Sequence, residues 1–111
     1  MWLLDVNIPL SIVDLLKGFN ITAEASEKHG WRELENGDLV AVAAGAGFSC
    51  LLTKDKRFSS SASKTLKKYI TFSVVIIDVP QVREALYLAA FEDAWRRFQI
   101  KPKPGKCISW P

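Results

Sequence analysis

Four short runs of mainly apolar residues divide this chain, and none of them has the 3.6-residue spacing of a helix. They cover residues 2–6, 20–23, 48–53 and 72–78, and the second is the shortest. The runs at 48–53 and 72–78 are apolar at nearly every position, which is typical of parallel strands covered by helices on both faces. We therefore predict four strands.

Amphipathic segments lie between these runs and predict helices. Pro9 suits a first helical turn, and the apolar spacing that follows, through Leu16, predicts a helix that Gly18 ends. A second helix is predicted to begin near Asp38, with Gly45 weakening its end. Residues 24–37, which precede it, are polar enough for a loop with room for one helical turn.

The second half of the chain predicts two further helices. One covers residues 61–69, capped by Ser61 or Ser63, after a serine-containing loop at 54–63. The other covers residues 81–98. Its expected buried face consists of Val82, Ala85, Leu86, Ala89 and Trp95. The tail from Ile100 contains Pro102, Pro104 and Gly105, so it is predicted not to be helical.

Strands that alternate with helices predict an α/β fold with right-handed crossovers and a mostly parallel sheet. We expect a three-layer α/β/α sandwich that forms a single domain over residues 1–111. Ligands of such sheets bind outside the carboxyl ends of the strands, near the point where strand order reverses. Candidate chemistry is therefore sought at those ends.

The composition is typical of a soluble globular domain with a single hydrophobic core, since 49% of the residues are hydrophobic and 24% are charged. The longest uncharged stretch has 15 residues, too few to span a bilayer, and the basic start of a signal peptide is missing. We expect a cytoplasmic protein with reduced cysteines and no membrane partner.

The net charge of +3 hides an uneven distribution. Residues 1–53 carry three bases and seven acids, a net charge of −4, whereas residues 54–111 carry twelve bases and five acids, a net charge of +7. Such asymmetry occurs in proteins that handle phosphates or nucleic acid, although an unevenly charged solvated surface is an equally good explanation.

Three acids fall where the fold predicts a ligand site: Asp5 after the first strand, Asp38 at the start of the second helix and Asp55 after the third strand. Crowded carboxylates need a cation, and hard oxygen ligands suit Mg²⁺ or Mn²⁺. Such an ion activates water and neutralises a phosphoryl group during hydrolysis. Each acid alone is also explained as a turn former or a helix cap.

Neighbouring residues are candidates for binding a phosphodiester substrate. Lys54, Lys56 and Arg57 surround Asp55 and could attract a polyanion, or they could form a solvated face. Thr53 could position a phosphate or simply pack in its strand. Asn7 could reach the metal's water shell or hold the turn after Asp5.

Several segments together resemble the small PIN-like proteins, a family regarded as nucleases and as candidate toxins of toxin–antitoxin pairs. The first segment, Leu3-Leu4-Asp5-Val6-Asn7-Ile8-Pro9, resembles the family's opening Leu-Leu-Asp-Glu-x-Leu-Pro. The others are Gly30-Trp31, Leu34, Asn36-Gly37-Asp38-Leu39, Ala43-Ala44, Phe48, Leu52-Thr53-Lys54-Asp55, and a tail in which a short β-like segment follows Pro104-Gly105.

The resemblance implies a PIN-like sandwich in which Asp5, Asp38 and Asp55 hold Mg²⁺ or Mn²⁺ and catalyse RNA hydrolysis. It also implies an antitoxin protein as a candidate partner, and a homodimer stays open. Two positions depart from the family pattern, because Val6 replaces a Glu and Arg57 replaces a second Asp. Even with these two departures, the resemblance makes a metal-dependent ribonuclease the first hypothesis.

Two alternatives remain. With fewer metal ligands, the chain could be a catalytically degraded module that binds RNA or a protein through its basic half. A phosphoacceptor signalling domain of similar topology ranks lower, because the first strand ends in one acid rather than an adjacent pair.

Overall fold

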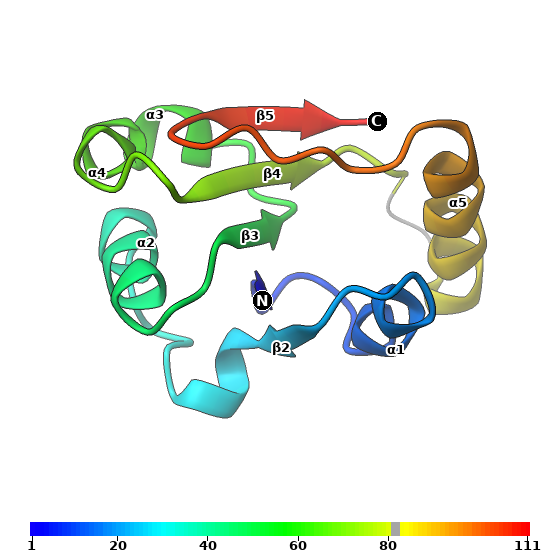
Figure 1. Cartoon of the computed structure of the whole chain (residues 1–111). Helices are drawn as coiled ribbons and strands as arrows, with labels where there is room; N and C mark the ends of the chain where they lie inside the picture. The colour runs from blue at the N-terminus through cyan, green and yellow to red at the C-terminus, as the bar shows by residue number, and fades with distance from the viewer. Residues whose placement is uncertain (81–82) are drawn as a thin grey trace.

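Five parallel strands form one sheet in the order β2-β1-β3-β4-β5 (Figure 1). The computed structural model describes residues 1–80 and 83–111. The strands are β1 (Trp2–Leu4), β2 (Ala23–Ala25), β3 (Cys50–Thr53), β4 (Ser73–Ile77) and β5 (Cys107–Trp110).

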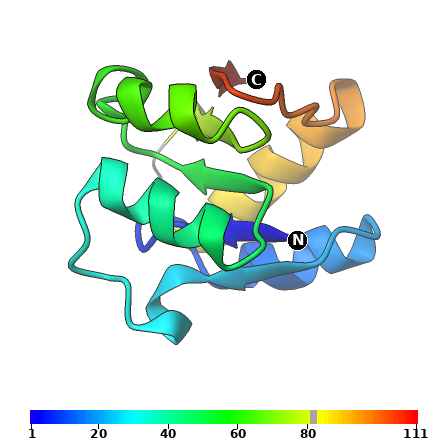
Figure 2. The same ribbon diagram turned by 60° about the vertical axis from the view of Figure 1, so that its left-hand side comes forward.

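Helices cover both faces of the sheet. One face carries α1 (Ser11–Gly18) and α5 (Glu84–Arg97), and a short 3₁₀ helix, η1 (Ser26–His29), follows β2. The other face carries α2 (Asn36–Gly45), α3 (Phe58–Ser61) and α4 (Ser63–Lys68), as Figures 1 and 2 show. The predicted α/β/α arrangement is confirmed. Within the described ranges, no helix combines the length and apolarity needed to cross a membrane.

Alternating side chains of the central strands fill two separate cores. Leu4 and Leu52 are paired across β1 and β3 and face α1 and α5, whereas Leu3 and Leu51 face α2, α3 and α4. All four side chains are fully buried. The sheet therefore lies between two apolar layers, which explains the near-continuous apolar sequence of its central strands.

Strand order reverses between β1 and β3. From β1 the chain crosses to β2 on one side, and later it returns to β3 on the other side of β1. In an open parallel sheet, such a switch point leaves a crevice outside the carboxyl ends of the two strands. Asp5 follows β1, and Lys54 and Asp55 follow β3, so all three residues lie at this edge.

The second strand begins later than the sequence predicts, at Ala23 instead of residue 20. Asn20 has a φ of +65°, and the amide of Ile21 donates to the carbonyl of Leu16. The end of α1 therefore continues through Asn20 in a left-handed conformation, which a strand does not allow.

Three further segments differ from the predicted secondary structure. Residues 58–61, predicted as loop, form α3, in which the hydroxyls of Ser60 and Ser61 donate to the carbonyl of Arg57. The non-helical tail adds β5, a fifth strand parallel to β4. The first strand is shorter than predicted and ends at Leu4.

The predicted buried face of the last helix is confirmed at Trp95 and wrong at Ala85, Leu86 and Ala89. Ala85 and Ala89 are exposed and Leu86 is 51% exposed, whereas the helix buries Tyr87, Phe91 and Trp95. These three aromatic residues recur every four positions and bury more apolar area than the alanine-rich face could. Val82 and the predicted start at residue 81 lie outside the described residues.

Candidate functional site

The hydroxyl of Thr53 joins the ends of β1 and β3. It donates to Oδ2 of Asp5 over 2.7 Å and accepts the backbone N–H of Asp55 over 3.1 Å. The Thr53 side chain is fully buried, so its hydroxyl depends on these partners. A single buried hydroxyl thereby holds the two acidic loops at one edge of the sheet.

Asn7 fastens the same two loops. Its side-chain oxygen accepts the N–H of Lys54 over 3.0 Å, and its Nδ2 donates to Thr53 Oγ1 over 3.2 Å. The same nitrogen lies 3.5 Å from Asp5 Oδ2. Asn7 therefore has the turn-holding role that was one of its two sequence interpretations.

Asp55 is saturated with hydrogen bonds from its own chain. Its Oδ1 accepts the backbone N–H and the Nε of Arg57 over 2.9 and 3.0 Å. Its Oδ2 accepts Arg57 Nη2 over 3.1 Å and Asn36 Nδ2 over 3.4 Å. Since a carboxylate offers about four lone-pair positions, Asp55 has none left while Arg57 stays in place.

The Arg57 guanidinium also sets the ionisation of this site. Hydrogen bonds from Arg57 hold the pKa of Asp55 below its ordinary value, and burial opposes them only in part. The same bonds raise the pKa of Arg57. Arg57 is 84% exposed and Asp55 only 16%, so the arginine lies over the acid from the solvent side. The Arg57 guanidinium therefore occupies the side of Asp55 from which a metal ion would approach.

Asp5 keeps more acceptor capacity than Asp55. Its Oδ1 accepts only the N–H of Val6, over 2.8 Å, so one lone-pair position on this atom is open. Asp5 is the half-buried carboxylate at the switch point. It is the acid in this crevice that can accept a further ligand without rearrangement.

The other two predicted substrate-binding bases also have partners in the chain. The Nζ of Lys54 lies 4.2 Å from the centre of the Tyr87 ring, and burial lowers the pKa of this lysine. Lys56 pairs with Asp78 at 3.6 Å. Lys54, Lys56 and Arg57 are thus all at the site, and each one contacts a group of its own chain.

Asp38 lies apart from the pair formed by Asp5 and Asp55. It is exposed in the first turn of α2, where a negative charge is favoured by the helix dipole. Across residues 1–80 and 83–111, no three His, Cys, Asp or Glu side chains are close enough together to hold a metal ion. The structure therefore joins two of the three predicted acids through Thr53 and does not join the third.

Two carboxylates still suit a hard divalent cation. Mg²⁺ is commonly bound through one or two carboxylates, with waters and substrate phosphates completing its shell. Asp5 offers an open oxygen position, and Asp55 would offer two if Arg57 moved away. The donor chemistry fits Mg²⁺ or Mn²⁺, and Arg57 is the group with which an ion must compete.

Sequence reasoning missed the role of Asn36 and Ser61. Asn36 donates to Ser61 Oγ over 2.7 Å and to Asp55, so it connects the start of α2 with α3 and the acid. The signal was present, because Asn36 belongs to the motif that carries the family resemblance. Tyr87 was also missed, and its buried hydroxyl has no partner among the described residues.

Comparison with family models, with curated proteins and with solved structures finds no match to this chain.

Proposed function

We propose that this protein is a PIN-like, metal-dependent ribonuclease whose metal-binding acids are Asp5 and Asp55. The observation that carries the proposal is the Thr53 hydroxyl, which ties both acids to the switch point of the sheet. The proposal includes RNA as substrate in the cytoplasm and an antitoxin protein as partner, as in the family that the sequence resembles.

Residue chemistry at this edge supports the proposal. Mg²⁺ or Mn²⁺, when bound, would activate water and offset the charge of the phosphodiester. Asp5 and Asp55 would supply the carboxylate oxygens, with Thr53 and Asn7 keeping Asp5 in position. Arg57 would exchange Asp55 for a phosphate, since a guanidinium binds either group through two parallel hydrogen bonds.

Cleavage assays test this proposal. RNA incubated with Mn²⁺ should be cut by the natural chain and not by Asp5→Asn. Asp14→Asn removes the same charge from an exposed position of α1 and should keep full activity. Equal cleavage by Asp5→Asn and the natural chain would overturn the mechanism. Asp38→Asn tells whether a third carboxylate is needed, and we expect it to stay active.

A second candidate function follows from the saturation of Asp55. If Arg57 permanently takes the place of the cation, the protein is a catalytically inactive module that binds RNA or a protein. Arg57→Gln separates the two functions. In the nuclease, removing this competing charge should strengthen Mn²⁺ binding by up to about fivefold, the upper end of the range for an exposed ion pair. An unchanged, negligible Mn²⁺ affinity would favour the inactive module.

A further inference from the structure

Five lysines gather on two segments that enter neighbouring strands. Residues 67–72 lead into the amino end of β4. Residues 98–106 start beside the carboxyl end of β5, where the indole N–H of Trp110 donates to the Phe98 carbonyl, and run back to the amino end of that strand. We call this surface the basic strip. Its lysines are Lys67, Lys68, Lys101, Lys103 and Lys106.

The lysines of the basic strip differ from the bases beside the acids. All five are exposed, and none forms an ion pair with another described residue. Residues 63–77 and 98–111 contain no acid at all. By contrast, Arg57 and Lys56 at the acidic edge are paired with carboxylates. Five bases without a neighbouring acid therefore gather on the strip.

The two segments of the strip are locked together. The N–H of Gly105 donates to the carbonyl of Phe72 over 2.8 Å, and the N–H of Lys106 donates to the carbonyl of Lys103 over 3.0 Å. Gly105 has a φ of +74°, and a Cβ there would lie 3.2 Å from the carbonyl oxygen of Ile70. Backbone contact of this kind holds lysines from distant parts of the sequence on one continuous surface.

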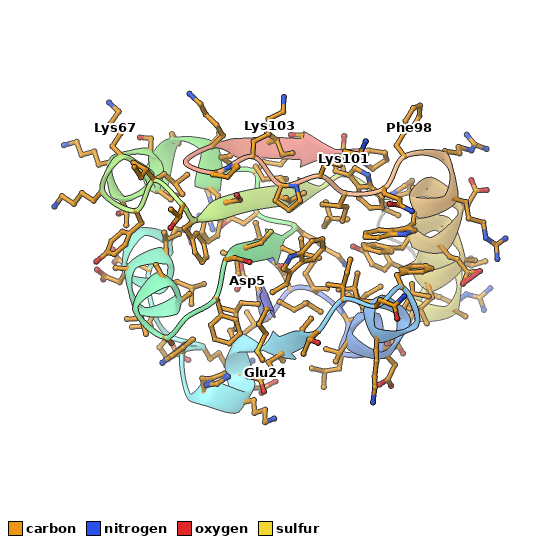
Figure 3. The ribbon with its side chains drawn as sticks, in the orientation of Figure 1. Asp5, Glu24, Lys67, Phe98, Lys101 and Lys103 are labelled. Carbon is orange, nitrogen blue, oxygen red and sulfur yellow. The ribbon has the colours of Figure 1, made fainter. Side chains whose placement is uncertain are left out.

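Large apolar side chains stand beside these lysines. Phe98 is 70% exposed and Ile70 is 68% exposed, the highest values among the large hydrophobic residues of the described chain. In Figure 3, Lys67, Lys103 and Phe98 project outward along the upper margin of the molecule, with Lys101 between Lys103 and Phe98. Exposed aromatic rings among cations are typical of surfaces that bind single strands, where lysines contact phosphates and rings stack on bases.

We propose that the basic strip binds single-stranded RNA, with its lysines on the phosphates and Phe98 stacked on a base. The choice of RNA rests on the proposed function, but the binding does not need the acids. Three of its lysines stand on the irregular segment 98–106 with its two prolines, and Lys67 and Lys68 end the six-residue α4, so the strip lacks the long amphipathic helix that membrane-surface proteins commonly use.

Fluorescence anisotropy with a labelled uridine RNA of about 12 nucleotides tests the strip. Measuring in EDTA removes the divalent ions that cleavage would need, so binding is read separately from the proposed nuclease activity. The test variant is Lys101→Gln with Lys103→Gln. Its matched control is Lys17→Gln with Lys28→Gln, which removes the same two charges from exposed positions outside the strip.

The strip variant should bind the RNA about tenfold more weakly at roughly 0.1 M salt, and its salt slope should fall by about 1.4, or 0.7 per phosphate contact. The control should stay close to the natural chain. Phe98→Ala should weaken binding at least about fivefold without changing the slope. Equal losses in both lysine pairs would overturn the proposal, as would tighter, strip-dependent binding to phosphatidylserine vesicles.

Discussion

Arg57 decides the chemical state of Asp55. Its side chain makes two of the four hydrogen bonds to this carboxylate, and its backbone makes a third. Exposed ion pairs of this kind contribute little to stability, since solvent screens them and both side chains lose freedom. The importance of the pair is local, because it fills the lone pairs that a metal ion would use.

The titration of Asp55 should therefore depend on Arg57. Since the folded pKa lies below the ordinary value of 3.8, the pair stabilises the fold above that pH and stops doing so as pH falls through the folded pKa. In Arg57→Gln the pKa of Asp55 should rise toward the ordinary value. Carboxyl ¹³C chemical shifts against pH measure it.

Arg32→Gln is the control for this titration, because Arg32 forms an exposed pair with Glu27 away from the site. It should leave the Asp55 midpoint where it is. A midpoint that does not move in Arg57→Gln would mean that the guanidinium does not set the ionisation of Asp55.

For single residues, the sequence predicts the place in the fold better than the hydrogen-bond partners. Asp5 and Asp55 could be placed at one edge because they directly follow two strands of a parallel sheet. The saturation of Asp55 could not be predicted, since it depends on the rotamer of Arg57 and on Asn36, which lies 19 residues away in the chain. The isolation of Asp38 depends on where α2 begins, and sequence patterns define helix ends poorly.

Among the elements, α5 carries the aromatic core of one face. Phe91 is fully buried and packs near Tyr87, Trp95 and Trp110, with ring centres 4.9 to 6.5 Å away. Aromatic side chains bury large areas, and tilted or offset rings gain some further attraction. Packing of these aromatic rings therefore holds α5 against the sheet.

Replacing Phe91 by Ala should lower the free energy of unfolding by about 3–5 kcal/mol, because it removes a buried ring and leaves a cavity. Leu86→Ala on the same helix is the control, since its side chain is already 51% exposed. It should cost well under about 1.5 kcal/mol. Denaturant unfolding followed by tryptophan fluorescence compares the two, and similar costs would mean that the buried face is assigned incorrectly.

The central strands could be predicted and the buried face of α5 could not, for the same physical reason. A central parallel strand is buried on both sides, so its run of apolar residues identifies it without knowledge of its neighbours. A helix buries one side only, and α5 offers two apolar stripes. The choice between them depends on ring area and on contacts with Phe19, which follows α1, and Trp110 of β5, which no local pattern contains.

The whole molecule depends on its fifth strand. β4 is buried at all five positions, and β5 covers its outer edge with parallel pairing from Cys107 to Trp110. The indole N–H of Trp110 also donates to the carbonyl of Phe98 over 2.7 Å. Without β5, an apolar strand would present its free backbone groups to other chains.

Ending the chain after Lys106 should therefore lower the melting temperature and convert monomer into larger species at a given concentration. A chain lacking only Pro111 keeps the whole of β5 and should behave like the natural protein. Size-exclusion chromatography with light scattering measures the difference. Two chains of the same size distribution would show that β4 is protected by something other than β5.

The two helical layers differ in how the chain supplies them. α2, α3 and α4 follow one another within residues 36–68, whereas α1 and α5 come from opposite ends of the sequence. During synthesis from the N-terminus, the first layer can close on β1, β3 and β4 while the second still lacks its aromatic helix. α1 can complete its packing only after α5 has formed. The Ser11 hydroxyl at the start of α1 then donates to the Glu84 carboxylate of α5. Asp5 lies on the loop that joins β1 to α1, so the acidic edge gains its final support only when α5 has emerged.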